Sequence, residues 1–371
     1  MDARGTGVRW RADQEFRYTR SRRGSWKAAD EQRRHREGES LPAFHRTLSR
    51  DVNFTTARPA AAMSYYVRET QVGHHRGLEI WKITDDEAIR LGTNTRGLWH
   101  YFRESGETIW DAIRRLGAWE RPDGSLPIHE LKIAPGHYFP RIARTIIPGP
   151  QSFEKQPGLQ PSLADNENAV ASARVQLSTL VRQLERICET VHPEERNLDA
   201  YGYDIRNLLI LACTEVESHW RAVLKANGVT KSRYTTNDYV DLAAAMKLNE
   251  FSISFPDYPW IASVAPFENW DKSNPTGSLQ WYDAYNAAKH DRENNSKKAT
   301  LGATIEAVAA CAIMIIAQFG ELFGFDLRTS GRPRTFFWIR NGPVWDLADC
   351  YSDFLESGKG QWVPVNYPFP S

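Results

Sequence analysis

The stretch "YDIRNLLILACTEVESHWRAVLKANG", residues 203–228, has the apolar spacing of a long amphipathic helix. At about 100° per residue around the helix axis, the apolar side chains form one arc and Glu217 falls on the opposite, polar arc. The pattern ends at Asn227-Gly228, a pair typical of a helix C-cap. The spacing therefore predicts a helix that buries one face in the protein core.

Two polar side chains in this stretch break the pattern. Glu215 and His219 lie one turn apart inside the apolar arc. A carboxylate among apolar side chains has to be paired, be protonated or line a cavity, because burying it unpaired is costly. Glu215 and His219 are therefore candidate site residues.

Further helices follow from the same spacing. Apolar residues recur at helical spacing in 168–192 and 281–290, and a shorter pattern covers 237–248. The run "AVAACAIMIIAQFG", residues 307–320, lies between Glu306 and Glu321 and is too short to span a bilayer. It predicts a buried core helix within a longer helix at 299–323, and gives no indication of a membrane partner.

The flanking segments differ in character. In residues 63–147, "YYVRET" and "GLEIWKI" predict strands, Thr84 with Glu87 predicts the start of a helix, and "GETIWDAIRRLG" predicts another helix. The Pro- and Gly-rich segment 148–164 reads as a linker. Residues 326–371 contain strand-like pieces, which we expect to pack on the outside of the helices.

The first 62 residues carry 13 Arg and one Lys against eight acidic residues, so this leader is about +6 in a chain of net charge +1. It has no apolar periodicity. One interpretation is a disordered extension, in one version translated from upstream of a true start at Met63. The other is a basic arm for nucleic acid.

The four cysteines lie far apart and form no CxxC pair, which argues against a zinc site and against a disulfide framework. Cys188, Cys213 and Cys311 fall in helical patterns and are expected to be small core residues. We therefore expect no metal and no cofactor, and a reducing cytoplasm is the simplest compartment.

A second polar row occurs in "WYDAYNAAKHDRENN", residues 281–295. Asn286 and His290 share its polar side, Lys289 flanks them and Arg292 follows. Glu215 and His219 could face this row across a helix–helix contact. Three interpretations remain open: a buried ion pair that sets the packing of the helices, a polar active or binding groove, or charged residues that simply lie at the rim of the core face.

Together, residues 165–325 resemble HEPN-like domains, which are small α-helical bundles of prokaryotic toxin–antitoxin and phage-defence systems. The resemblance rests on "RNLLILACTEVESHWRAVLKANG", on "SLQWYDAYNAAKHDRENN" and on the apolar closing helix. It implies a mainly α fold: a HEPN-like helical bundle preceded by a small α+β N-terminal domain.

Active members of that family resemble metal-independent ribonucleases with an Arg, four to six intervening residues and then a His, often at a dimer cleft. The resemblance places that His at His290, where it would do acid–base work. The family's Arg would fall at 283–285, but those residues are Asp283, Ala284 and Tyr285. Arg292 follows the His instead.

The sequence and the resemblance together give two hypotheses about function. In the first, the protein is a non-catalytic module that binds RNA or a partner protein such as an antitoxin, with Lys289, Asn286 and His219 as RNA-binding candidates. In the second, it is a metal-independent endoribonuclease with His290, Arg292 and Glu215 as catalytic candidates. A homodimer is compatible with both, and a small ligand between helices is a third possibility.

Overall fold

The computed structural model describes residues 63–72, 75–92, 99–117, 119–121, 124–147, 160–164, 166–320, 336–353 and 362–370. Residues 58–371 form one compact unit. The predicted leader, residues 1–62, lies outside the described residues.

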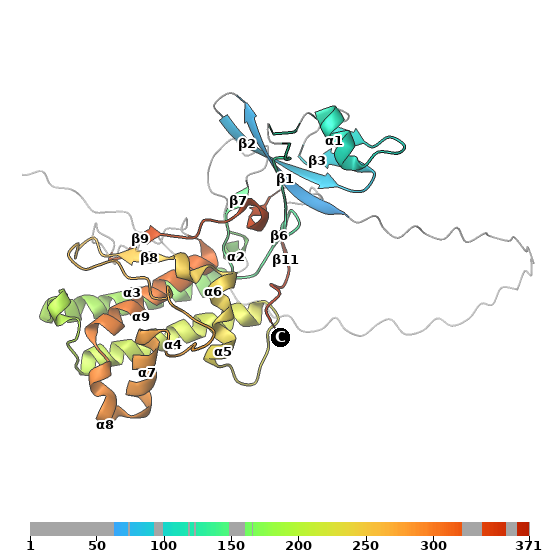
Figure 1. Ribbon diagram of the computed structural model, residues 1–371. Helices are drawn as coiled ribbons and strands as arrows, with labels where there is room; N and C mark the ends of the chain where they lie inside the picture. Colours follow the sequence, from blue (N-terminus) through green and yellow to red (C-terminus); the bar gives the residue numbers. More distant parts are fainter. Residues whose placement is uncertain are drawn as a thin grey trace, which may run out of the picture. The chain divides into compact units, whose positions relative to one another are not determined.

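A five-stranded antiparallel sheet forms the first part, in the order β4-β3-β2-β1-β5 (Figure 1). Its long strands β1 (Ser64–Val72) and β2 (His75–Ile83) pair along their whole length and match the two strand predictions. The shorter strands are β3 (Glu87–Arg90), β4 (His100–Phe102) and β5 (Ile128–Glu130). Neighbouring residues of a strand point to opposite faces, so the fully buried Ile80 and Trp81 of β2 place apolar side chains on both faces of the sheet.

The turn between β2 and β3 corrects one prediction. The Thr84 hydroxyl accepts a hydrogen bond from the Glu87 backbone N–H, as in a helix N-cap, but Glu87 begins strand β3. A threonine side chain makes this local bond in turns as well as in helices, so the motif alone does not distinguish them.

Both faces of the sheet are covered. Helix α1 (Ile109–Gly117), at the predicted place, packs its Ile109, Ala112 and Ile113 against Trp81. A second cluster of buried side chains contains Val67 and Ile80 from the sheet together with Leu131, Ile147 and Cys350. The sheet therefore needs residues from the far end of the chain to complete its core.

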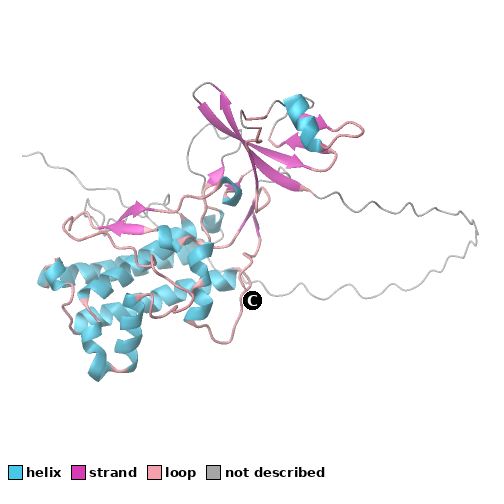
Figure 2. Cartoon of the chain, viewed as in Figure 1, coloured by secondary structure: helices cyan, strands magenta, loops and turns pink. Residues whose placement is uncertain are grey.

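Four long helices form the second part: α3 (Glu167–Thr190), α4 (Tyr203–Ala226), α7 (Gln280–His290) and α9 (Leu301–Phe319). Figure 2 shows them packed as one group, with the strand pair β8 (Ser252–Ser254) and β9 (Trp338–Asn341) beside them. The short helices are α2 (Pro161–Ala164), α5 (Thr236–Tyr239), α6 (Asp241–Ala245) and α8 (Arg292–Asn295).

Helix α9 is the centre of this group and packs against α3, α4 and α7. Among the described helices it alone is long and apolar enough to cross a membrane, but 83% of its most apolar window is buried inside the protein. It is the core helix that the sequence predicts. Cys188, Cys213 and Cys311 are buried core residues, also as predicted.

The contact between α4 and α9 repeats every two helical turns. Thr304 donates to the Ile205 carbonyl at 3.2 Å, the Cys311 thiol donates to the Ala212 carbonyl at 3.2 Å, and Gln318 meets His219 at 3.2 Å. Each pair is separated by the same number of residues, so the two helices run parallel and in register. Small alanine and cysteine side chains let the backbones approach this closely.

Residues near the C-terminus also pair with strands that come just before α2. β6 (His137–Tyr138) pairs with β11 (Val363–Pro364), and β7 (Ile146–Ile147) pairs with β10 (Tyr351–Ser352), both parallel. The predicted C-terminal strands exist, but only β9 packs on a strand of the helical part, at β8. The other two pair with residues 137–147.

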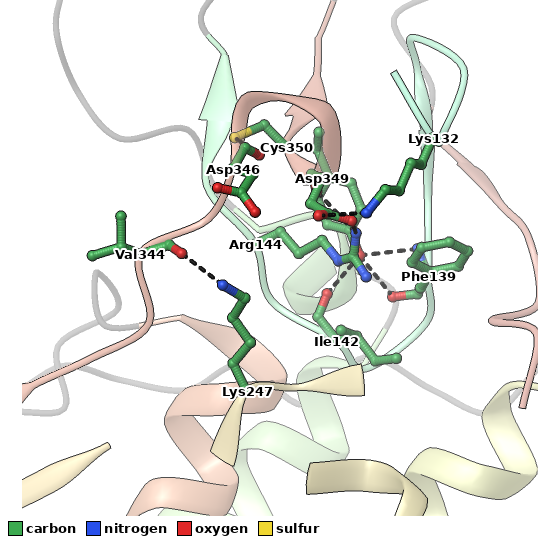
Figure 3. Close-up of polar contacts among 10 residues, drawn as sticks. Lys132, Phe139, Ile142, Arg144, Lys247, Val344, Asp346, Asp349 and Cys350 are labelled. Carbon is green, nitrogen blue, oxygen red and sulfur yellow. Dashed lines mark hydrogen bonds and ion pairs between the residues drawn. The ribbon is translucent and has the colours of Figure 1, made fainter. Parts of the chain in front are cut away.

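A buried arginine stabilises the seam, by which we mean the contact of residues 137–147 with β10 and β11. Figure 3 shows Arg144 donating to the backbone carbonyl of Asp349 at 2.9 Å and to its carboxylate at 3.3 Å. The exposed Lys132 pairs with the other carboxylate oxygen at 2.8 Å. The Arg144 guanidinium lies over four aromatic rings, those of Phe139, Trp345, Tyr351 and Tyr367.

The predicted fold class, a mainly α HEPN-like helical bundle preceded by a small α+β domain, is wrong. Helix accounts for 45% and strand for 16% of the structure, the sheet has five antiparallel strands, and the whole is not clearly a helical bundle. The reason is that strands of two to four residues are too short to show an alternating pattern in the sequence.

The segment 148–164, predicted as a linker, lies within the single compact unit. Residues 148–159 are outside the description, but the rest is packed. The Gln160 side chain bonds both the N–H and the carbonyl of Arg144, and the Ser162 hydroxyl accepts from the Arg141 N–H. These contacts join the segment to the loop before it.

Replacing Arg144 with Met is expected to lower the free energy of unfolding by about 3 kcal/mol, because it leaves the mostly buried Asp349 without its buried partner. Lys132→Met removes the exposed partner of the same carboxylate and should cost below about 1 kcal/mol. Urea unfolding of both variants measures the difference. Equal losses would show that the buried pair is not what holds the seam.

Candidate functional site

The predicted site residues separate into two clusters. Glu215 and His219 lie against α9 and the loop at Arg141, whereas Asn286 and Lys289 lie on α7. The expected meeting of Glu215 with the polar row of α7 is therefore corrected by the structure. The cause is rotation of α4: its face toward α7 carries Glu217, which we had placed on the solvent side.

The first cluster is a buried chain of hydrogen bonds. Arg141 Nε donates to Gln318 Oε1 at 2.7 Å, and Gln318 Nε2 donates to His219 Nδ1 at 3.2 Å. His219 then carries its proton on Nε2, which lies 3.5 Å from Glu215 Oε1. Arg141 has a left-handed backbone (φ 59°), so the chain ties a strained loop to the end of α9.

Burial controls the charge of this cluster. Desolvation, aided by the charge of Arg141, lowers the pKa of His219 to about 4, and desolvation raises the pKa of Glu215. His219 is thus neutral at neutral pH and only 4% exposed. A neutral, buried imidazole bound to a core glutamine supports packing rather than phosphate binding.

We expect the stability of the protein to fall as the pH drops from 6.5 to about 4. In this window unfolded chains protonate His219 while the folded protein does not, so the unfolded state binds more protons. The difference between the pKa of His219 in the unfolded chain and in the folded protein corresponds to roughly 3 kcal/mol of folding free energy. His219→Gln should show a shallower loss, measured by urea unfolding at several pH values.

Glu215 acts in the opposite direction, because its raised pKa favours the folded state as the pH falls. It is present in both proteins, so the comparison between them isolates His219. Identical pH slopes for wild type and His219→Gln would contradict the assignment of a neutral buried histidine.

The second cluster joins α7 to α4. The Tyr282 hydroxyl donates to Glu217 Oε1 at 2.7 Å, and burial together with this bond raises the pKa of Tyr282. Lys289 Nζ donates to the Tyr285 hydroxyl at 2.7 Å, and Asn286 Nδ2 donates to the Tyr282 carbonyl at 3.1 Å. The side chains of Asn286 and Lys289 are therefore engaged within α7 itself.

His290 is exposed as the last residue of α7. Asp291 follows it and caps α8, accepting from the Asn294 backbone N–H at 3.2 Å. Arg292 is the first residue of α8, but its side chain lies outside the description. Among the predicted residues whose side chains are described, Lys289 and His290 are exposed, and Lys289 is bound to the Tyr285 hydroxyl.

Sequence reasoning missed two cavities at the beginning of α4. The larger, of about 640 Å³, lies between the end of α3 and the start of α4; it is lined by Gln183, Arg186, Ile187, Thr190, Val191, Tyr201, Gly202, Tyr203, Asp204, Ile205, Asn207 and Leu211. The smaller, of about 390 Å³, reaches α8 and the residue after it; it is lined by Tyr201, Gly202, Tyr203, Arg206, Glu293 and Ser296. Three residues, 201–203, line both.

The two shared tyrosines are unusually open. Tyr201 is 60% exposed and Tyr203 is 73% exposed. The Arg206 guanidinium lies 5.4 Å from the centre of the Tyr203 ring. We call Tyr201, Gly202, Tyr203 and Arg206 the tyrosine surface.

The backbone beneath the tyrosine surface is fixed. Tyr201 forms a β-bridge with Thr300, and the Leu301 N–H donates to the Ala200 carbonyl at 2.8 Å. The surface is thus anchored to the start of the core helix α9. The only sequence signal for it is the pair of tyrosines in "AYGYD", directly before a strongly periodic helix.

Comparisons with protein-family models, curated proteins and solved structures give no match. Within the described residues, no group of three or more His, Cys, Asp and Glu side chains lies together as a metal site would require.

Proposed function

We propose that the protein is an RNA-binding module that holds single-stranded RNA on the tyrosine surface. The observation that carries the proposal is the pair of open tyrosine rings at the junction of two cavities, with a guanidinium over one ring. Proteins bind single strands by stacking bases on aromatic rings beside a cation that follows the backbone.

The stacking half of this chemistry is supplied by Tyr201 and Tyr203. Large exposed aromatic rings cost free energy in water, whereas a base on each ring would remove apolar area from solvent. Because the backbone is fixed through Thr300 and Leu301, little conformational entropy is lost when a base stacks.

The phosphate half is supplied by three sources. Arg206 lines the smaller cavity, and its Nη2 donates to Asn207 Oδ1, which orients the guanidinium. The N-cap of α4 is Gly202, with no side-chain cap, so the first N–H groups of this helix stay available for an anion. Lys297 and Lys298 are exposed just after Ser296 of the same cavity.

The segment that carries the resemblance to RNA-acting HEPN-like domains continues into α8, which lines the smaller cavity. Its His290 is followed directly by Asp291 and α8, and α8 supplies Glu293 to the smaller cavity. The resemblance supports RNA as the ligand.

We expect Tyr203→Ala to weaken RNA binding by about 1–3 kcal/mol, or roughly 5- to 150-fold in Kd, because one stacking ring is lost. Tyr203→Phe keeps the ring and should bind nearly as wild type. Fluorescence anisotropy of the full chain with a labelled single-stranded RNA measures both. Phe102→Ala removes a 56% exposed ring on the sheet and is the control.

Equal binding by Tyr203→Ala and the control would remove the tyrosine surface from the proposal. Absence of RNA binding by the wild-type protein would remove the proposed function itself.

A second candidate function is metal-independent endoribonuclease activity, favoured by the exposure of His290 next to α8. Arg206 is the described cation at the adjoining cavity and could hold phosphate there. If His290 is the acid–base group, His290→Ala should reduce cleavage of labelled RNA in EDTA at least about 100-fold while binding persists.

His129→Ala is the matched control for this test, since His129 pairs with Glu69 on the sheet. Cleavage that is unchanged in His290→Ala would assign the activity to another group, and no cleavage by the wild-type protein would leave the binding function alone.

A further inference from the structure

The larger cavity has polar groups that stacking and phosphate binding leave unused. Gln183 and Arg186 come from α3, and Asp204 comes from the first turn of α4. These three side chains line one cavity of about 640 Å³, a volume that suits a small organic group.

These groups are free to bind a ligand. In the described part of the chain, Gln183, Arg186 and Asp204 form no hydrogen bond and no ion pair with other described residues. Elsewhere in the described part of the chain, acids and bases pair closely: Lys231 with Asp238 at 2.6 Å and Lys272 with Asp241 at 2.8 Å. The larger cavity instead keeps an arginine and an aspartate that both line it but do not bind each other.

A carboxylate beside a guanidinium matches one base better than the others. Guanine presents two neighbouring N–H donors, at N1 and N2, on one edge and two acceptors, O6 and N7, on the next. A carboxylate accepts from the two donors, and arginine donates to O6 and N7 in a bidentate pair. Adenine lacks the N1–H and N2 donors and O6, while cytosine and uracil lack the N7 acceptor.

We propose that the larger cavity recognises a guanine base of the bound strand, with Asp204 on the N1–H and N2 edge and Arg186 on O6 and N7. This inference rests on the proposed function, because Tyr203 belongs to both cavities and stacks the base that enters. Gln183 provides a further amide at the cavity wall. RNA binding then prefers strands that contain an unpaired G.

The experiment measures Kd by fluorescence anisotropy of the full chain with uridine-rich RNA that carries one variable base. The variable base is guanine, adenine, hypoxanthine, which lacks the N2 amino group, or 7-deazaguanine, which lacks N7. Wild type should bind the guanine strand at least about tenfold more tightly than the adenine strand. The hypoxanthine and 7-deazaguanine strands should each lose part of that preference.

Two variants test which side chain contacts which edge of the guanine base. Asp204→Asn should bind guanine and hypoxanthine strands alike, and Arg186→Gln should bind guanine and 7-deazaguanine strands alike. Asp283→Asn is the control for the first, because Asp283 is also an exposed acid in the first turn of a helix. Arg182→Gln is the control for the second, one turn earlier on α3 and outside the cavity.

The outcomes separate this inference from the proposed function. Binding of all four strands with equal Kd overturns the guanine site and leaves RNA binding intact. If no strand binds, calorimetry with guanosine monophosphate and adenosine monophosphate tests whether the larger cavity binds guanine without the rest of an RNA strand. Guanosine monophosphate bound by wild type but not by Asp204→Asn supports the site, and no binding of either nucleotide overturns it.

Discussion

The close parallel contact of α4 and α9 is the constraint on which the rest of the helical part depends. It is possible because α9 presents alanine, threonine and cysteine where larger side chains would hold the backbones apart, and its polar atoms reach the α4 backbone at Ile205 and Ala212. The register of this pair fixes the rotation of α4. That rotation turns His219 toward Gln318 and Glu217 toward Tyr282, so it decides which acid of α4 meets which helix.

The same contact leaves the start of α4 open. Segment 198–202 is pinned to the beginning of α9, since the N–H groups of Leu301 and Gly302 donate to the carbonyls of Ala200 and Leu198. The tyrosines beside it project into solvent instead of the core. A buried core contact thereby positions a surface, and the cavities form where α3, α4 and α8 end or begin.

The end of α4 has the complementary role of joining distant parts of the chain. Asn227 is 3% exposed; its amide nitrogen donates to the Pro140 carbonyl, and its oxygen accepts from the Tyr367 N–H. Gly228 follows in a left-handed conformation (φ 81°) with Asn366 packed against it. With the buried Arg144–Asp349 pair, these contacts integrate the C-terminal residues with the loop before α2. A single compact unit results.

Residue periodicity by itself determined the long helices, the two long strands and the core positions of the cysteines, because those features depend on local spacing and on apolar burial. It also identified Glu215 and His219 as misfits on an apolar arc. Only the tertiary structure decided what those misfits contact, which strands pair across the chain, and that Tyr201 and Tyr203 stay exposed. Pairing of strands two residues long and exposure of a tyrosine depend on packing partners far away in the sequence, and local spacing carries no information about those partners.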